Sequence, residues 1–137
     1  MAVRWALVVA WMAVVFFFSS LSHLGMAARV PDWISHPIEY GIGAVLVCRA
    51  LEGGRRRPFT ASTALIATLL TTAYGVTDEY HQSFVPGRTS DRADVAKDFA
   101  GAAAACAFYR RWTKRAAHVA PERPHSKASE NSTEISR

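Results

Sequence analysis

The sequence predicts an all-α fold: a polytopic bundle of four transmembrane helices with both chain termini in the cytoplasm. The first observation is that the apolar residues gather in four blocks, and two of these blocks contain no charged residue. At about 1.5 Å rise per residue, a run of ~17 to 25 apolar residues matches a bilayer core of ~30 Å. The second is that basic residues lie at the ends of the blocks. We therefore expect one four-helix membrane domain over residues 1–112, followed by a tail over 113–137.

The first predicted span covers residues 5–21, a run without a charge. A cleaved signal peptide is the alternative, since Arg4 precedes the run and Gly25, Met26 and Ala27 offer small residues for cleavage. We prefer a retained helix, because the run exceeds the ~7 to 15 apolar residues of a signal core and further spans follow it.

The second and third predicted spans cover residues 33–51 and 59–77. The second is polar in its first half and apolar in its second, whereas the third has no charge and follows Pro58, a residue tolerated at a helix start. Both are expected to cross the membrane.

The fourth predicted span, residues 95–112, is the least apolar, with Lys97 and Asp98 in its first turn and many alanines after them. Gly101 and Ala105 are small residues at a spacing of four, which lets helix backbones approach closely in a bundle. The tail from Thr113 contains no aromatic residue and few aliphatic ones. We predict that the tail is disordered and cytoplasmic, because it cannot bury enough surface to offset its ordering entropy.

Lysine and arginine residues near the spans indicate the orientation. Those on the side of the chain termini are Arg4, Arg49, Arg55, Arg56, Arg57, Arg110, Arg111, Lys114 and Arg115. Those on the opposite side are Arg29, Arg88, Arg92 and Lys97. The excess favours cytoplasmic termini and a multi-pass protein of the cell membrane. The same placement argues against nucleic acid as a partner, although the formal net charge is +5.

Polar residues at helical spacing lie at the outer ends of three predicted helices. Asp32, His36 and Tyr40 repeat every four residues, with Glu39 beside them. Asp78 and Gln82 share a face if their helix continues through Gln82, and Asp94 and Asp98 share a face of the last helix. Because these ends meet on one side of a four-span bundle, we expect one outward-facing polar pocket.

The residue types in this pocket suit a binding or acid–base site. The candidates for catalysis are Glu79, Asp78 and His81, and those for ligand binding are Arg88, Gln82, Asp94, Asp98, His36, Glu39 and Tyr40. Arg88 suits an anionic group. A metal site built from His36, Glu39, Glu79, His81, Asp94 and Asp98 is chemically feasible. Its spacing resembles no established metal motif, so no metal site is predicted. The sequence does not indicate which cofactor the protein uses.

The stretch from Asp78 to Gly101 resembles the signature of the VanZ-like membrane protein family. The resemblance rests on Asp78, Glu79, Gln82, Phe84, Pro86, Arg88, Asp94, Asp98 and Gly101. Upstream, Asp32, His36, Glu39 and Tyr40 resemble a second family segment, and Ser19 and Ser20 a preceding pair. Trp33 departs from the lysine common in the family. The resemblance implies an integral membrane protein linked to resistance to glycopeptide antibiotics, notably teicoplanin.

Two classes of function stay open at this level. One is a membrane protein that acts on or binds a cell-envelope or lipid-linked ligand, with a membrane lipid, an envelope precursor or a glycopeptide as partner. The other is a non-catalytic membrane scaffold in which charge pairs such as Arg88 with Asp94 or Asp78 are structural. The residues do not decide whether the protein is an enzyme.

Overall fold

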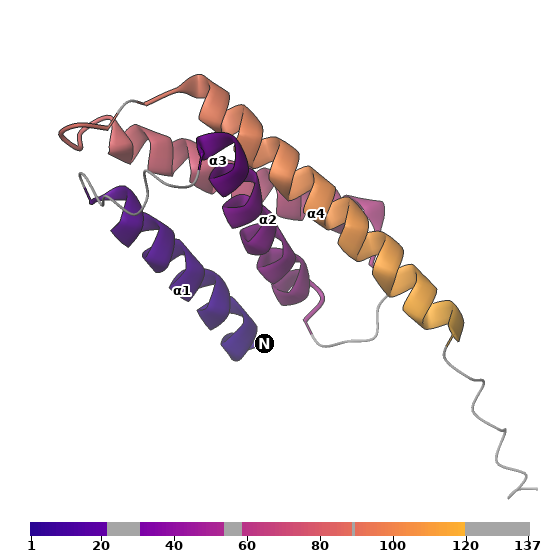
Figure 1. Ribbon diagram of the computed structural model, residues 1–137. Helices are drawn as coiled ribbons and strands as arrows, with labels where there is room; N and C mark the ends of the chain where they lie inside the picture. Colours follow the sequence, from indigo (N-terminus) through magenta and orange to yellow (C-terminus); the bar gives the residue numbers. More distant parts are fainter. Residues whose placement is uncertain (22–30, 54–58, 89, 120–137) are drawn as a thin grey trace, which may run out of the picture.

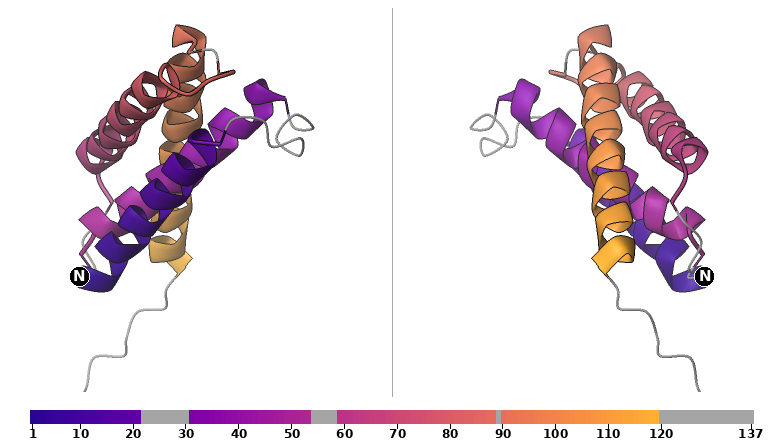
Figure 2. Two further views of the ribbon diagram at one scale, coloured as in Figure 1. Left: turned by 90° about the vertical axis from the view of Figure 1, so that its left-hand side faces the viewer. Right: turned by 90° about the vertical axis from the view of Figure 1, so that its right-hand side faces the viewer.

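A computed structural model describes residues 1–21, 31–53, 59–88 and 90–119. The described residues form four α-helices and no strand, which confirms the all-α prediction (Figure 1). The helices are α1 (Ala2–Ser19), α2 (Asp32–Leu51), α3 (Ala61–Gln82) and α4 (Arg92–Val119). They are inclined to one another rather than parallel (Figure 2).

Consecutive helices run in opposite directions, so each end of the bundle gathers two helix starts and two helix ends. At one end, Ser19 of α1 bonds Asp78 of α3, and His36 of α2 bonds Asp98 of α4. We call this the polar end, because it holds the buried carboxylates. At the opposite end, Arg4 donates to the carbonyl oxygen of Arg49 at 2.9 Å, and Tyr109 donates to Glu52 at 2.9 Å.

Helices α2 and α4 pack closely because Gly101 has no side chain. A Cβ atom built on Gly101 would collide with the backbone of Pro37. The apolar core lies mainly toward the opposite end of the bundle. It consists of Val8, Ala44, Val47, Cys48, Ala50, Phe59, Ala67, Ala102 and Cys106. The core therefore leaves the polar end to hydrogen-bonding side chains.

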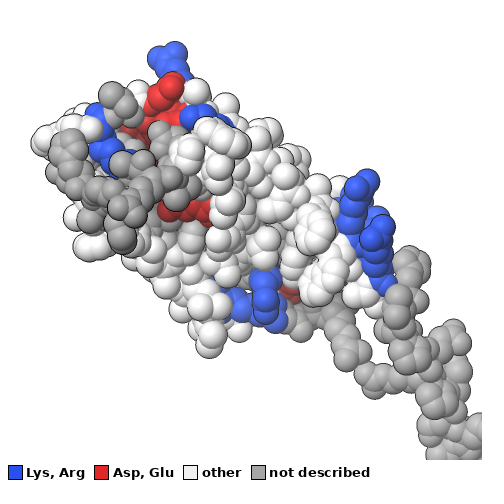
Figure 3. Space-filling model, in the orientation of Figure 1, with Lys and Arg blue, Asp and Glu red and all other residues white. Residues whose placement is uncertain are grey.

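All four helices expose large hydrophobic side chains. Examples are Phe17 on α1, Ile42 on α2, Leu69 on α3 and Phe108 on α4. Most of the face between the two ends carries no charged side chain (Figure 3). Among the described helices, α1 is the one that is long and apolar enough to cross a membrane by length and composition.

The predicted bounds of α3 and α4 are corrected. Helix α3 continues to Gln82, past the expected end at residue 77, which places Asp78, Glu79 and Gln82 on its last turns. Helix α4 begins at Arg92 and continues to Val119, so residues 113–119 are helical although the sequence assigned them to the tail. Lysine, arginine and alanine are good helix formers, and low hydropathy does not prevent a helix. Residues 120–137 of the predicted disordered tail lie outside the described residues.

Candidate functional site

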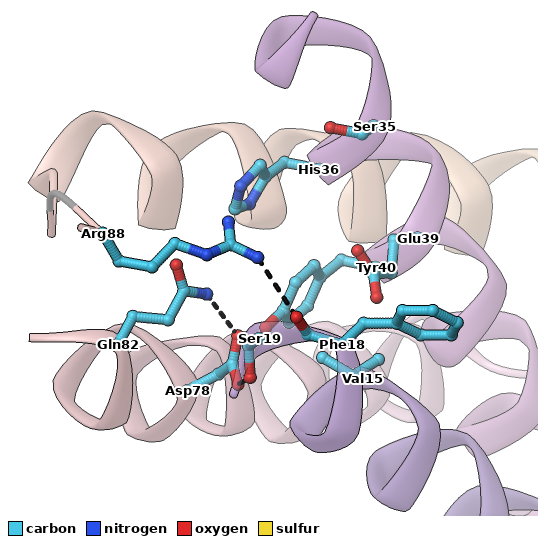
Figure 4. A pocket seen from close by; sticks show the side chains of 10 residues that line it. All are labelled: Val15, Phe18, Ser19, Ser35, His36, Glu39, Tyr40, Asp78, Gln82 and Arg88. Carbon is cyan, nitrogen blue, oxygen red and sulfur yellow. Dashed lines mark hydrogen bonds between the residues drawn. The ribbon is translucent and has the colours of Figure 1, made fainter. Parts of the chain in front are cut away.

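A cavity of about 310 Å³ opens at the polar end between α1, α2 and α3 (Figure 4). Its wall also includes Arg88, which follows α3. The lining residues are Val15, Phe18, Ser19, Ser35, His36, Glu39, Tyr40, Asp78, Gln82 and Arg88. Six of them, namely His36, Glu39, Tyr40, Asp78, Gln82 and Arg88, are residues that the sequence nominated.

Asp78 joins α1 to α3 at one side of this cavity. Its side chain is 4% exposed, and both carboxylate oxygens accept a hydrogen bond. Ser19 donates to Oδ1 at 2.6 Å, and the Gln82 amide donates to Oδ2 at 2.8 Å. Helical spacing explains the second bond, since residues four apart lie on one face. Asp78 is thus a carboxylate held in place by one hydrogen bond to each of its oxygens.

Arg88 extends into the cavity between His36 and Gln82 (Figure 4). Its Nη2 donates to the carbonyl oxygen of Phe18 at 3.2 Å. Among the described residues it forms no ion pair, so the expected pairing of Arg88 with Asp94 or Asp78 is not found there. A guanidinium has five N–H donors, and most of those of Arg88 remain available to a ligand.

Glu39 and Tyr40 present a second set of polar groups to the same cavity. Tyr40 is 1% exposed and packs edge-on against Trp11, with ring centroids 5.7 Å apart. Within the part of the chain that the structure describes, neither the Glu39 carboxylate nor the Tyr40 hydroxyl makes a side-chain hydrogen bond. Both groups are therefore free to contact a bound molecule.

His36 links α2 to α4. Its Nδ1 lies 3.0 Å from Oδ1 of Asp98, and its Nε2 lies 4.0 Å from Oδ2 of Asp94. Asp98 is 1% exposed, and Asp94 also accepts a hydrogen bond from Lys97. The ring of His36 is thereby fixed in orientation, because the nitrogen facing Asp98 donates when that carboxylate is ionised.

Gly75 makes room for this pair. A Cβ atom built on Gly75 would lie 2.7 Å from Oδ2 of Asp98 and 3.0 Å from Cε1 of Tyr40. The absence of a side chain on α3 lets the Asp98 carboxylate and the Tyr40 ring occupy the space between the helices.

His36, Gln82 and Arg88 also line a second, smaller cavity of about 180 Å³. Its remaining lining residues are Gly87, Asp91, Asp94 and Lys97. Asp94, another nominated residue, therefore faces this second cavity. Arg88 lines both cavities.

Two of the three candidates for catalysis lie away from both cavities. Glu79 accepts a hydrogen bond from the backbone N–H of Asp91 at 2.7 Å, which anchors the connection to α4. His81 lies against α1, with Nε2 3.0 Å from Oγ of Ser20 and the ring stacked on Phe16 at 4.3 Å. Asp98 lines neither of these two cavities and is hydrogen-bonded to His36.

The candidate metal ligands are distributed over separate places. His36, Asp94 and Asp98 lie together, whereas Glu79 and His81 contact other elements. Within residues 1–21, 31–53, 59–88 and 90–119, no group of three or more His, Cys, Asp or Glu side chains is arranged to hold a metal ion.

Sequence reasoning did not nominate four residues of the larger cavity: Val15, Phe18, Ser19 and Ser35. Ser19 carried a detectable signal, since it ends an apolar run and belongs to a pair that resembles the VanZ-like pattern. Nothing in the sequence marks Val15, Phe18 or Ser35, because their place in the cavity wall depends on how α1 lies against α2.

The family model described as VanZ/LLP1 matches residues 34–113, which is more than half of the chain. The match contains the nominated residues of α2, α3 and α4 and excludes α1. No curated protein and no solved structure matches the chain. The sequence signature, the helical fold and the match over most of α2 to α4 agree, and the chain belongs to the VanZ/LLP1 family.

Proposed function

We propose that the protein is a multi-pass protein of the cell membrane whose polar end faces outward. The exposed hydrophobic side chains on all four helices support this, since a lipid environment is where such a surface is stable. The excess of basic residues on the side of the chain termini supports the direction. In this arrangement the two cavities open toward the cell envelope.

The function that the geometry supports best is binding of a cell-envelope or lipid-linked ligand through an anionic group. The observation that carries it is Arg88, whose guanidinium enters a 310 Å³ cavity and bonds a backbone carbonyl there. A phosphate or carboxylate binds a guanidinium through two parallel hydrogen bonds. The Tyr40 hydroxyl, which lines the same cavity, is a further donor.

The VanZ family name links this proposal to teicoplanin resistance. A protein that binds an envelope component at the outer face of the cell membrane is placed where it can alter how a glycopeptide reaches its target. This role requires binding and does not require catalysis.

A membrane scaffold is the second candidate, and the buried hydrogen bonds favour it. Ser19 with Asp78 ties α1 to α3, and His36 with Asp98 ties α2 to α4. A satisfied polar network of this kind fixes how helices associate. The position of Arg88 in a cavity is the feature that a pure scaffold leaves unexplained.

Replacing Arg88 with glutamine tests the binding function. The loss of a charge-assisted contact of about 1.5 to 3 kcal/mol weakens ligand binding by roughly ten- to 150-fold. We expect the wild-type chain, expressed in a teicoplanin-susceptible bacterial host, to raise the inhibitory concentration of teicoplanin and R88Q to lose that increase. The measurement is the inhibitory concentration at equal membrane levels of the two proteins.

Arg92→Gln is the matched control, because Arg92 is an exposed arginine at the start of α4 and lines neither cavity. It is expected to behave as wild type. An R88Q variant that protects as well as wild type contradicts the binding function and favours the scaffold.

A further inference from the structure

We infer that the ligand of the 310 Å³ cavity is a zwitterionic phospholipid headgroup, with its phosphate on Arg88 and its amine on Glu39. This inference rests on the ligand site proposed above and adds the chemical class of the ligand.

Two residues of opposite charge line the cavity without forming a direct ion pair. Arg88 and Glu39 both belong to the wall, and no ion pair joins them within 4.0 Å among the described residues. They come from different elements, Glu39 from α2 and Arg88 from the chain after α3. A molecule that fills the space between them meets a cation at one place and an anion at another.

Glu39 differs from the other carboxylate of the wall. Each oxygen of Asp78 already accepts one hydrogen bond, from Ser19 or from Gln82, whereas Glu39 accepts none in the described residues. Glu39 is partly buried and makes no side-chain hydrogen bond in the described part of the chain. A carboxylate withdrawn from water is stabilised by a cation that approaches it, and an amine supplies both the charge and N–H donors.

Tyr40 adds a hydrogen-bond donor to the cavity wall. It is 1% exposed and lines the cavity beside Glu39, and its hydroxyl has no hydrogen-bond partner in the described residues. A phosphate or glycerol oxygen of a bound headgroup supplies an acceptor for it.

The size and surroundings of the cavity favour a lipid over a soluble molecule. About 310 Å³ is at the lower end of the range for ligand pockets, which suits a headgroup rather than a whole lipid. Val15 and Phe18 of α1 form an apolar part of the wall, and Phe18 is 52% exposed. Acyl chains that continue from the headgroup can lie on this exposed apolar surface of α1.

The test compares two short-chain phospholipids on the full-length protein in detergent. Dioctanoyl phosphatidylethanolamine carries a phosphate and an amine, and dioctanoyl phosphatidylglycerol carries the phosphate without the amine. Apparent dissociation constants are measured by native mass spectrometry. We expect wild type to bind the ethanolamine lipid about tenfold more tightly, a difference of ~1.4 kcal/mol.

Glu39→Gln and Arg88→Gln separate the inference from the function on which it rests. E39Q is expected to reduce the tenfold preference to about onefold while still binding the glycerol lipid, which also shows that this variant is folded. R88Q is expected to lose both lipids. An unchanged preference in E39Q, or equal binding of both lipids by wild type, overturns the zwitterionic headgroup and leaves the function of Arg88 standing.

Binding of both lipids by R88Q as tightly as by wild type overturns the proposed function itself. Glycerophosphoethanolamine, the same headgroup without acyl chains, distinguishes a lipid ligand from a soluble one. Weaker binding of this soluble compound supports the lipid, and binding as tight as that of the ethanolamine lipid overturns the lipid as the source.

Discussion

Replacing Gly101 with valine is expected to destabilise the bundle by about 3 kcal/mol or to prevent its assembly. The reason is the contact of α4 with α2, where even a Cβ atom on residue 101 would collide with the backbone of Pro37. A backbone cannot rotate away as a side chain can, so the two helices must separate. Thermal unfolding of the detergent-solubilised protein measures the effect.

Ala107→Val is the control for Gly101→Val, since Ala107 is exposed on the same helix. Its effect is expected to stay within about 0.5 kcal/mol. Gly101→Ala sharpens the comparison, because alanine in a helix is favoured over glycine by roughly 1 kcal/mol and any loss must come from the collision. A G101V variant as stable as wild type contradicts the close packing of α2 and α4.

Replacing Asp98 with leucine is expected to cost about 3 kcal/mol of stability, the lower part of the range for removing one partner of a buried pair. Asp98 is 1% exposed and bonds His36 at 3.0 Å, so leucine leaves the histidine without that partner. The apolar side chain also lies where the carboxylate met Gly75. Thermal unfolding of the detergent-solubilised protein measures this loss of stability.

Asp98→Asn is the milder change, because the amide keeps the size of the side chain and can still bond His36. We expect it to cost about 1 kcal/mol or less. Equal stability of D98L and wild type contradicts the structural importance of the pair.

The residues that share a face of one helix could be predicted from the sequence, because helical spacing alone determines them. Asp78 and Gln82 were expected to share a face if α3 continued through Gln82, and they bond at 2.8 Å. Asp94 and Asp98 were expected to share a face of the last helix, and both lie near His36. Four helices were likewise expected from four apolar blocks.

Contacts between residues of different helices could not be predicted from the sequence. They depend on how the helices pack against one another, and the spacing of residues along the chain does not determine that packing. The sequence did not pair His36 with Asp98 or Ser19 with Asp78, and it placed Glu79 in the pocket although the side chain turns to the Asp91 backbone. The end of α4 was misjudged for a different reason: hydropathy reports preference for lipid, and residues 113–119 are helical without it.

Thiol labelling of intact cells tests most directly that the cavity opens to the cell exterior. A cysteine in place of Ser35, which lines the cavity, is compared with one in place of Glu52 at the opposite end of the bundle. The native thiols, Cys48 and Cys106, are buried and give little background. We expect a membrane-impermeant maleimide to label S35C in intact cells, and E52C only after the membrane is permeabilised. Labelling of E52C but not S35C in intact cells contradicts the outward-facing site.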